Sequence, residues 1–438
     1  MSGERPAVSV RRDERLEEEV HAAVLEDGMP VRIIPRPGWQ KRFAVVTVGY
    51  GAIDVAFAPP GQEAVRELPA GIAHFLEHKL FEDEAGDVFD QFARHGASAN
   101  AYTTAVETAY HFTTSTRFEE CLDLLLDLVT DPFFTAEKIE KERRVIAQEI
   151  RMYADDPDAQ LHLQLLRALY QRHPVREDVA GSEASIERIG REELELCHRS
   201  FYQPANMLLS VAGDVDPGAV LDQLGASLRR RAAERGAPER RPFRRALPDE
   251  PAAPGEARVE RRMSVAHPKL LMGWKDEPGL MGRDALRRTL ESYLLLELLF
   301  GRSSAFYEAN YAAGLLDPGF AHHYTHSRGH YAHGLVGGET RDPQALIAAV
   351  EACIEAARRS GLEPDAFRRI QRKVVGAYLK GFNSSEHLAG RETDAFFEGW
   401  EVTEYLGLLE SIQLADLERR SHELLRPERR ALSLVLPG

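Results

Sequence analysis

The feature that most constrains the fold is a weak internal repeat at close to half the length of the chain. Residues Ile189–Ala212 can be laid on Ile412–Val435 with Pro204 on Pro427, an offset of 427 − 204 = 223 positions. Each segment reads as a helix, a proline-containing turn and a strand. A repeat of this length predicts that one supersecondary unit occurs twice in the fold.

A second pair of segments repeats at a similar interval. Phe134–Ile150 resembles Leu362–Tyr378 at an offset of 362 − 134 = 228, and in the first pair Ser210 meets Ser433. Half of the 438-residue chain is 219 residues, close to both offsets. The chain is therefore predicted to consist of two related lobes.

Each lobe is predicted to mix strands with long helices. Ala44–Tyr50 and Ala109–Ser115 are rich in β-branched and aromatic residues, which is typical of strands. Cys121–Val129 has helical apolar spacing, and Cys121 is expected in the core. Without strict strand–helix alternation, this predicts an α+β fold in which each lobe is a mostly antiparallel sheet with helices on one face.

A connector is predicted between the lobes. Arg229–Arg262 is rich in Arg, Pro, Ala and Glu and has almost no large apolar residue, so it cannot build a core. Its arginines could mark a nucleic-acid patch, but the interleaved acidic residues favour a solvated linker. The predicted division is a first lobe over residues 1–228, a linker over 229–262 and a second lobe over 263–438.

Composition excludes several classes of protein. The hydrophobic fraction of 43% excludes global disorder, and the net charge of −15 disfavours nucleic-acid binding. Three widely spaced cysteines exclude a disulfide scaffold and a cysteine-rich zinc ribbon. The first residues lack an apolar signal-peptide core, and no apolar run is long enough to span a bilayer, so we expect a cytoplasmic protein without membrane contact.

The stretch that points to chemistry is H-x-x-E-H, formed by His74, Glu77 and His78. On a helix, residues four apart share a face, so both imidazoles can reach one ion. Imidazole nitrogen suits zinc, and a carboxylate beside the metal can act as general base toward metal-bound water. With 16 histidines in the chain, however, the motif can also arise by chance.

A catalytic zinc of this kind needs a third protein ligand, and the segment after residue 135 offers a candidate. Glu142 and Glu149 are seven residues apart, so they lie on one helix face near the apolar Val145 and Ile146. A buried carboxylate needs a partner, which a zinc ion would provide. Surrounding charges leave open that Glu142 belongs to a solvated charged surface.

Together these residues resemble the pitrilysin/insulinase/mitochondrial-processing-peptidase family of zinc peptidases with an inverted motif. The resemblance spans nearly the whole chain. Besides the motif after Gly71, it rests on Gly96–Thr104 (GASANAYTT), the pair Glu142-x6-Glu149, His173-Pro174 before Gly181, and Pro204-x-Asn206 before a strand.

The resemblance implies roles for individual residues. It implies that one zinc ion per chain is bound by His74, His78 and Glu149, and that Glu77 is the general base. Glu142 would orient a ligating histidine from outside the ligand set. An edge strand with Asn100, Ala101 and Tyr102 would bind an extended peptide by strand addition.

One departure bears on partners. The family's second lobe often supplies an Arg and, seven residues on, a Tyr that contact the substrate, but here Asn310 and Asp317 stand at those positions. In the family a full chamber uses four lobes in a clamshell, so this chain resembles half of an enzyme. We expect a paralogous, metal-less subunit to supply the Arg/Tyr pair, with a homodimer as the alternative.

The sequence leaves other functions open. The first expectation is a zinc metalloendopeptidase acting on extended peptides or unstructured segments. The alternatives are a non-catalytic peptide-binding or scaffold subunit, and a dedicated leader-peptide protease. A second metal site is conceivable in a histidine cluster of the second lobe, although partly exposed histidines on a strand explain it as well; the cluster is His322, His323, His326, His330 and His333. The aromatic residues Phe396, Phe397 and Trp400 are interpreted as packing residues rather than a peptide anchor.

Overall fold

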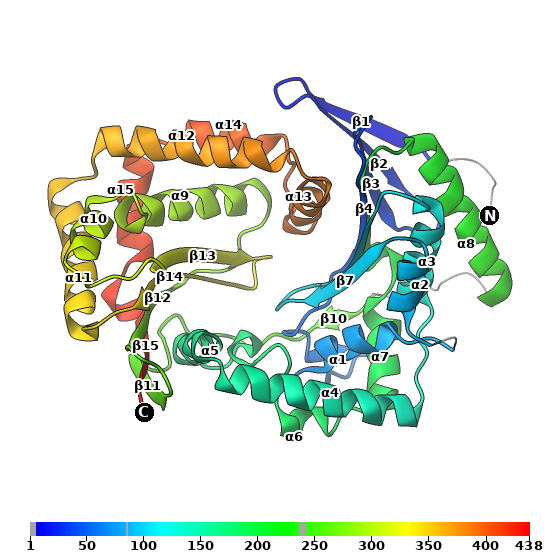
Figure 1. The fold of residues 1–438 in the computed structure, drawn as a ribbon, viewed down its shortest axis with the longest axis horizontal. Coiled ribbons are helices and arrows are strands. Elements are labelled where there is room, and N and C mark those ends of the chain that lie inside the picture. Colours follow the sequence, from blue (N-terminus) through cyan, green and yellow to red (C-terminus); the bar gives the residue numbers. More distant parts are fainter. Residues whose placement is uncertain (1–5, 85, 236–241) are drawn as a thin grey trace. The chain divides into compact units, whose positions relative to one another are not determined.

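The computed structural model describes residues 6–84, 86–235 and 242–438 (Figure 1). It divides into two compact units, each made of separate stretches of chain. The first unit comprises Met1–Ile150, Asp178–Leu247 and Leu379–Phe397. The second comprises Arg151–Glu177, Pro248–Tyr378 and Glu398–Gly438. Within the described ranges, no helix is long and apolar enough to cross a lipid bilayer.

The first unit is built on a seven-stranded sheet in the order β1-β2-β3-β9-β4-β8-β7. Only β3 and β9 are parallel neighbours; the other neighbours are antiparallel. Strand β7 lies at one edge of this sheet. The strands are β1 (Val8–Asp13), β2 (Glu18–Val24), β3 (Pro30–Pro35), β9 (Met207–Gly213), β4 (Arg42–Val48), β8 (Thr108–Thr114) and β7 (Ser98–Thr103).

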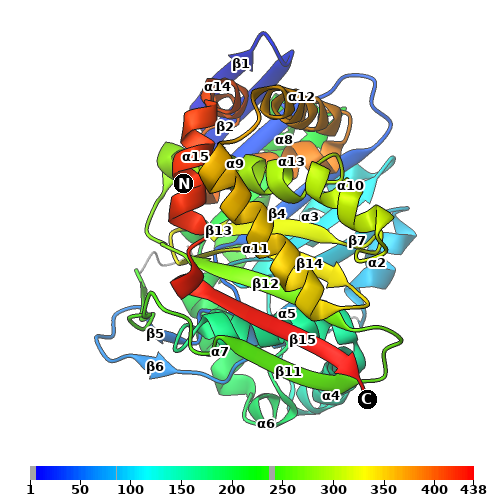
Figure 2. The ribbon, with the colours of Figure 1, turned by 90° about the vertical axis from the view of Figure 1, so that its left-hand side faces the viewer.

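The second unit is built on a five-stranded sheet in the order β11-β15-β12-β14-β13. Figure 2 shows β11, β15 and β12 side by side; β11 and β15 are parallel and the other neighbours antiparallel. The strands are β11 (Arg258–Met263), β15 (Arg430–Pro437), β12 (Lys269–Asp276), β14 (Tyr331–Glu339) and β13 (Ala321–Ser327). This is the topology of β3-β9-β4-β8-β7, strand for strand, so the predicted duplication and the α+β class are confirmed.

The helices follow the same order in both halves of the chain. The first half contributes α1 (Ile72–Leu80), α2 (Val88–Arg94), α3 (Phe118–Thr130), α4 (Ala136–Asp155), α5 (Pro157–Leu169) and α7 (Arg191–Phe201). The second half contributes α9 (Gly282–Phe300), α10 (Ala305–Ala312), α11 (Pro343–Ser360), α12 (Pro364–Gly381), α13 (Ser385–Glu398) and α15 (Leu414–Leu424). Pro204 and Pro427 each open a 3-10 turn before the last strand, as the 223-residue offset predicts.

Equivalent helices are exchanged between the two units. Helix α5 packs on the second unit's sheet, where Ser433 Oγ donates to Leu161 O at 2.8 Å. Most of α13 belongs to the first unit, where its Thr393 hydroxyl lies 3.3 Å from that of Ser210. Strand β9 is buried throughout and β15 is buried over residues 431–435, because the exchanged helix covers the sheet face opposite the main helical layer. The units are therefore not the consecutive halves expected from the sequence.

The segment expected as a solvated linker contributes to both units. Helix α8 (Pro217–Arg235) extends into it, residues 236–241 lie outside the described ranges, and β10 (Arg244–Arg245) pairs with β5 (Ala56–Ala58). Farther along, the Glu250 carboxylate accepts the backbone N–H groups of Gln171, Arg172 and His173 in the second unit. Strand pairing, hydrogen bonds to the backbone, the Arg245–Asp54 ion pair and the packing of Phe243 on Phe201 hold this segment in place.

The core of the first unit positions helix α1. Helix α3 contributes its apolar face, and Cys121 is buried there as expected. Helix α1 lies against β7, β8 and α7, and Phe75 and Leu76 are fully buried. Because the helix is enclosed, its polar side chains must find partners within the protein.

Candidate metal centre

Helix α1 begins at a tight contact between two glycines. Gly71 has a left-handed φ of 91°, and a Cβ there would lie 2.4 Å from Ala180 O. Gly181 has φ 77°, and its Cβ would lie 2.4 Å from Ala70 O. Only glycine allows this approach, which fixes where α1 starts and explains why both glycines accompany the motif.

The two motif histidines face the same side of α1. His74 is 9% exposed, and its ring centroid lies 4.5 Å from that of His78. This is the arrangement that the four-residue spacing predicts for one helix face.

Glu149 on α4 completes a group of three possible ligands. Its Oε2 lies 3.7 Å from His74 Nε2 and 3.6 Å from His78 Nε2. In a tetrahedral zinc site with bonds of about 2.0–2.1 Å, ligand atoms are separated by roughly 3.3 Å. The observed separations and the two-His, one-carboxylate donor set therefore fit zinc. No other group of His, Cys, Asp and Glu in the described part of the chain is close enough to share an ion.

Glu142 lies behind this group rather than in it. Its Oε1 accepts a hydrogen bond from His78 Nδ1 at 2.9 Å, and the residue is 9% exposed. The contact holds the imidazole with Nε2 toward Glu149. Glu142 is thus buried, whereas the side chain of the neighbouring Glu140 is 51% exposed and pairs with Arg143 and Arg144.

The environment sets different proton affinities on the two histidines. Burial, together with the nearby His78, lowers the pKa of His74 to about 3, so its imidazole is neutral and available as a ligand. Burial also lowers the pKa of His78, but the hydrogen bond to Glu142 and the charges of Glu77, Glu142 and Glu149 outweigh it and raise the pKa overall. A cation bound to His78 would displace the proton that this raised pKa favours.

Glu77 lies on α1 between the histidines and is 8% exposed. Burial raises the pKa of its carboxyl group, partly offset by a hydrogen bond from Thr103. Thr103 Oγ1 donates to Glu77 Oε2 at 2.6 Å. The sequence alone does not predict this contact between Thr103 and Glu77, although Thr103 lies in the run Gly96–Thr104 that is part of the family resemblance.

Strand β7 has the alternation expected of an edge strand with one buried face. Asn100 and Tyr102 are exposed on one side, whereas Ala101 and Thr103 are partly buried on the other. β7 pairs with β8 along one side, and its other side has no strand neighbour among the described residues. This edge could accept an added strand.

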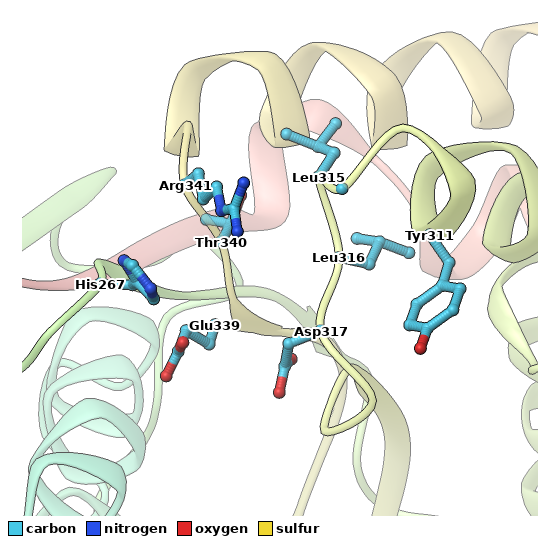
Figure 3. Close-up of a pocket in the computed structure, with 9 residues that line it drawn as sticks. His267, Tyr311, Leu315, Leu316, Asp317, Glu339, Thr340 and Arg341 are labelled. Carbon is cyan, nitrogen blue, oxygen red and sulfur yellow. The ribbon is translucent and has the colours of Figure 1, made fainter.

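Asn310 and Asp317 occupy the two positions where the resemblance leads us to expect Arg and Tyr. Asn310 lies on α10, where its side-chain amide donates to Phe306 O at 2.7 Å. Asp317 lines a cavity of about 410 Å³ in the second unit together with Tyr311, Glu339 and Arg341 (Figure 3). The carboxylates of Asp317 and Glu339 point to the same side of this cavity.

The histidine cluster of the second unit lies on β13, on β14 and in the turn between them. His322 Nε2 lies 3.1 Å from Glu297 Oε2, whereas His333 is buried with Nδ1 3.1 Å from the Tyr170 hydroxyl. These are separate pairs with protein partners. The aromatic residues Phe396 and Phe397 pack edge to face with centroids 5.1 Å apart.

Comparison with known proteins matches both halves of the chain to one family. The model described as insulinase (peptidase family M16) matches residues 65–183, and the model described as peptidase M16 inactive domain matches residues 188–374. The division parallels the structure, in which the candidate ligands lie in the first matched region.

Individual relatives match along nearly the full chain. An uncharacterized zinc protease of Bacillus subtilis, YmfH, is 36% identical over 425 residues, covering 97% of this chain and 98% of that protein. A crystal structure described as an M16-like peptidase from Alicyclobacillus acidocaldarius superposes with a TM-score of 0.92 at 36% identity, over 96% of this chain and 99% of that one. Pitrilysin shares the fold with a TM-score of 0.74 at 15% identity, and the match covers 99% of this chain but 47% of pitrilysin. The chain is a two-lobed member of the M16 family of zinc protease-like proteins, to which insulinase and pitrilysin belong.

Proposed function

We propose that the protein is a zinc metalloendopeptidase that hydrolyses extended peptides or unstructured protein segments. The observation that carries this proposal is the convergence of His74, His78 and Glu149 within ligand distance, with the buried Glu77 beside them. In this proposal His74, His78 and Glu149 hold one zinc ion per chain. Zinc would supply a Lewis acid that polarises the scissile carbonyl and increases the acidity of water.

Glu77 then moves the proton. Its carboxylate accepts a proton from water as the water oxygen forms a bond to the carbonyl carbon. When the C–N bond breaks, Glu77 returns that proton to the leaving nitrogen, so the carboxylate is regenerated. Its burial and raised pKa suit a group that must both accept and release a proton near neutral pH.

Strand β7 is proposed to bind the substrate. An extended peptide can pair with its free edge beside Asn100, Ala101 and Tyr102 through main-chain hydrogen bonds. Because such bonds do not depend on side-chain identity, we expect broad tolerance of sequence but a strict requirement for an unfolded segment.

The test replaces Glu77 with Gln and measures zinc content and cleavage of an unstructured fluorogenic peptide. Loss of a general base should lower turnover by about 10²- to 10⁴-fold while zinc stays bound. Glu140→Gln is the matched control because Glu140 is an exposed carboxylate on α4, and it should behave as wild type. Unchanged turnover of Glu77→Gln would contradict the mechanism. A zinc-free wild-type protein that still binds peptide would favour the scaffold alternative.

We propose in addition that a paralogous, metal-less subunit contributes the Arg/Tyr pair. Asn310 and Asp317 support this, since neither side chain can replace a guanidinium or a phenol at these positions. Turnover should rise when the paralogue is added to the purified chain. Equal turnover with and without it would remove this proposal, and a rate that depends on the chain's own concentration would favour a homodimer.

A further inference from the structure

We infer that Thr103 is a positioning residue that holds the Glu77 carboxylate in its working orientation. This inference rests on the proposed function. The hydroxyl of Thr103 on β7 donates to Glu77 Oε2 on α1 at 2.6 Å, and the two residues are 26 positions apart in the sequence. That length lies in the range of about 2.5–2.7 Å found for hydroxyl-to-carboxylate bonds, which are stronger than neutral ones.

Among the residues that the structure describes, the acceptor closest to the Thr103 hydroxyl is Glu77 Oε2. The neighbouring hydroxyl of Thr108 is 3.4 Å away and donates its own proton to Tyr50 O at 2.9 Å. Thr108 therefore has no proton left to give to Thr103. Thr103 donates to Glu77 because this carboxylate oxygen is charged and lies at 2.6 Å, whereas the Thr108 oxygen lies at 3.4 Å.

The backbone at the end of β7 keeps Thr103 in place. Thr103 pairs with Thr108 as the last pair of the β7–β8 ladder. The following turn is closed by Thr104, whose backbone N–H donates to Glu107 O at 2.8 Å and whose hydroxyl accepts from the N–H groups of Val106 and Glu107. A β-branched side chain on such a backbone has little rotamer freedom, so the hydroxyl is fixed before substrate binds.

Because of this contact, the two oxygens of the Glu77 carboxylate have different roles in the proposed mechanism. Oε2 is bonded to Thr103, which leaves Oε1 for the proton transfer. When Oε1 carries the transferred proton, Oε2 is the carbonyl oxygen of the acid and can still accept from Thr103, so the contact survives. Proton transfer is sensitive to such orientation, because the carboxylate must stay within hydrogen-bond reach of the attacking water.

The second unit uses the equivalent strand position differently. The 223-residue offset lays Leu209 on Leu432, and strand pairing across each sheet then makes Val336 the counterpart of Tyr110. Because Ala101 lies opposite Tyr110 and His322 opposite Val336, Tyr324 is the counterpart of Thr103. The Tyr324 hydroxyl donates at 2.7 Å to the carboxylate of Asp276, which also forms a buried ion pair with Arg420. A hydroxyl next to a carboxylate is thus present in both lobes, but in the first lobe that carboxylate belongs to the H-x-x-E-H motif.

The experiment compares Thr103→Val, which removes the hydroxyl at nearly constant shape, with Thr103→Ser, which keeps it. Zinc content, kcat and KM for an unstructured peptide, and the Glu77 side-chain orientation in crystals of the zinc-loaded variants are measured. Thr103→Val should keep zinc, leave KM within about twofold and lower kcat about 10- to 100-fold, with Glu77 turned away from its wild-type position. Thr103→Ser should restore kcat to within about threefold of wild type. Thr113→Val on the adjacent strand is the control and should not change kcat.

The outcomes separate this inference from the proposed function. If Glu77→Gln abolishes turnover but Thr103→Val leaves both kcat and the Glu77 orientation unchanged, the role of Thr103 is refuted and the peptidase stands. Loss of zinc from Thr103→Val would also refute it, since the residue would then act on the metal. If the wild type shows no turnover, the proposed function fails, whereas the Glu77 orientation still tests Thr103. Should Thr103→Val fail to fold, Thr103→Ala is used with the same expectations, because it is smaller and cannot clash.

Discussion

The two lobes have the same topology and the same order of helices but satisfy their buried charges in different ways. In the first lobe, His74, His78 and Glu149 leave three ligand atoms turned toward one another. In the second lobe, Glu297 on α9 is paired with Lys373 on α12 at 2.6 Å and with His322 on β13 at 3.1 Å. In the second lobe the protein itself thus supplies a cation to the buried carboxylate, whereas in the first lobe the proposed zinc ion would supply it.

A second contrast lies beneath these groups. By the strand register and the 223-residue offset, Tyr50 and Cys197 of the first lobe correspond to Asp276 and Arg420 of the second. Tyr50 and Cys197 are adjacent, and burial raises the pKa of both, so they stay uncharged. Asp276 and Arg420 form an ion pair and are 5% and 1% exposed. The two lobes therefore share a topology but stabilise their buried polar side chains in different ways, one with uncharged groups and the other with an ion pair.

Removing a candidate ligand tests the first contrast and should have the largest effect. Glu149→Gln should lose zinc and lower peptide turnover at least about a thousandfold, because the metal supplies several kcal/mol to the transition state. Glu297→Gln, the matched change in the second lobe, should leave zinc content and turnover unchanged. Metal analysis measures the zinc content and the peptide assay measures the turnover of both variants. Equal losses of zinc and turnover in the two variants would contradict the proposed difference between the lobes.

Breaking the buried ion pair tests the second contrast. Asp276→Leu alone leaves Arg420 charged and unpaired, so it should lower the free energy of unfolding by about 3–5 kcal/mol. Adding Arg420→Leu and Tyr324→Phe removes the guanidinium and the hydroxyl that have lost Asp276 as a partner. The free energy of unfolding of this triple variant should be within about 2 kcal/mol of wild type. Urea denaturation followed by circular dichroism measures both. A triple variant no more stable than the single one would show that the second lobe depends on the charges themselves.

Helices α4 and α12 differ at the position of Glu142, because at the 228-residue offset its counterpart on α12 is the apolar Ile370. Glu142→Gln should weaken zinc binding about 10- to 100-fold, because His78 loses a charged partner on Nδ1. Competition with a chromophoric chelator measures the affinity. Ile370→Val should not change it, and wild-type affinity in Glu142→Gln would remove the orienting role.

The smallest effect concerns pH and the histidine of α7. Burial lowers the pKa of His198 to about 4, partly offset by its 2.9 Å hydrogen bond to Val129 O, and at the 223-residue offset its counterpart is Ser421. Below the unfolded pKa of about 6.5, the unfolded chain binds a proton that the folded protein refuses until about pH 4, so stability falls as the pH falls through this window. From pH 6.5 to 5 the loss is about 2 kcal/mol. His198→Gln should lose that much less over the same interval in urea titrations; parallel curves for the two proteins would contradict it.

Short-range spacing made the candidate site predictable. The face shared by His74 and His78 follows from helix geometry, and the spacing of Glu142 and Glu149 follows from the same geometry on α4. The resemblance to a family linked these two segments, because nothing local says that α1 and α4 meet. Thr103 was missed because its contact with Glu77 joins a strand to a helix through tertiary packing.

The sequence by itself determined the duplication, the mixed α+β class and the residue types available for metal chemistry, because these depend on repeats, periodicity and side-chain identity. The tertiary structure decided which sheet each helix covers. The apolar faces of α5 and α13 indicate that both helices are buried, but an amphipathic pattern does not specify the partner. Helix α5, from the first half of the chain, packs in the second unit, and α13, from the second half, packs in the first. Only the fold brings His74, Glu77 and Thr103 together with Glu149, because a functional site depends on distances between elements and not on order along the chain.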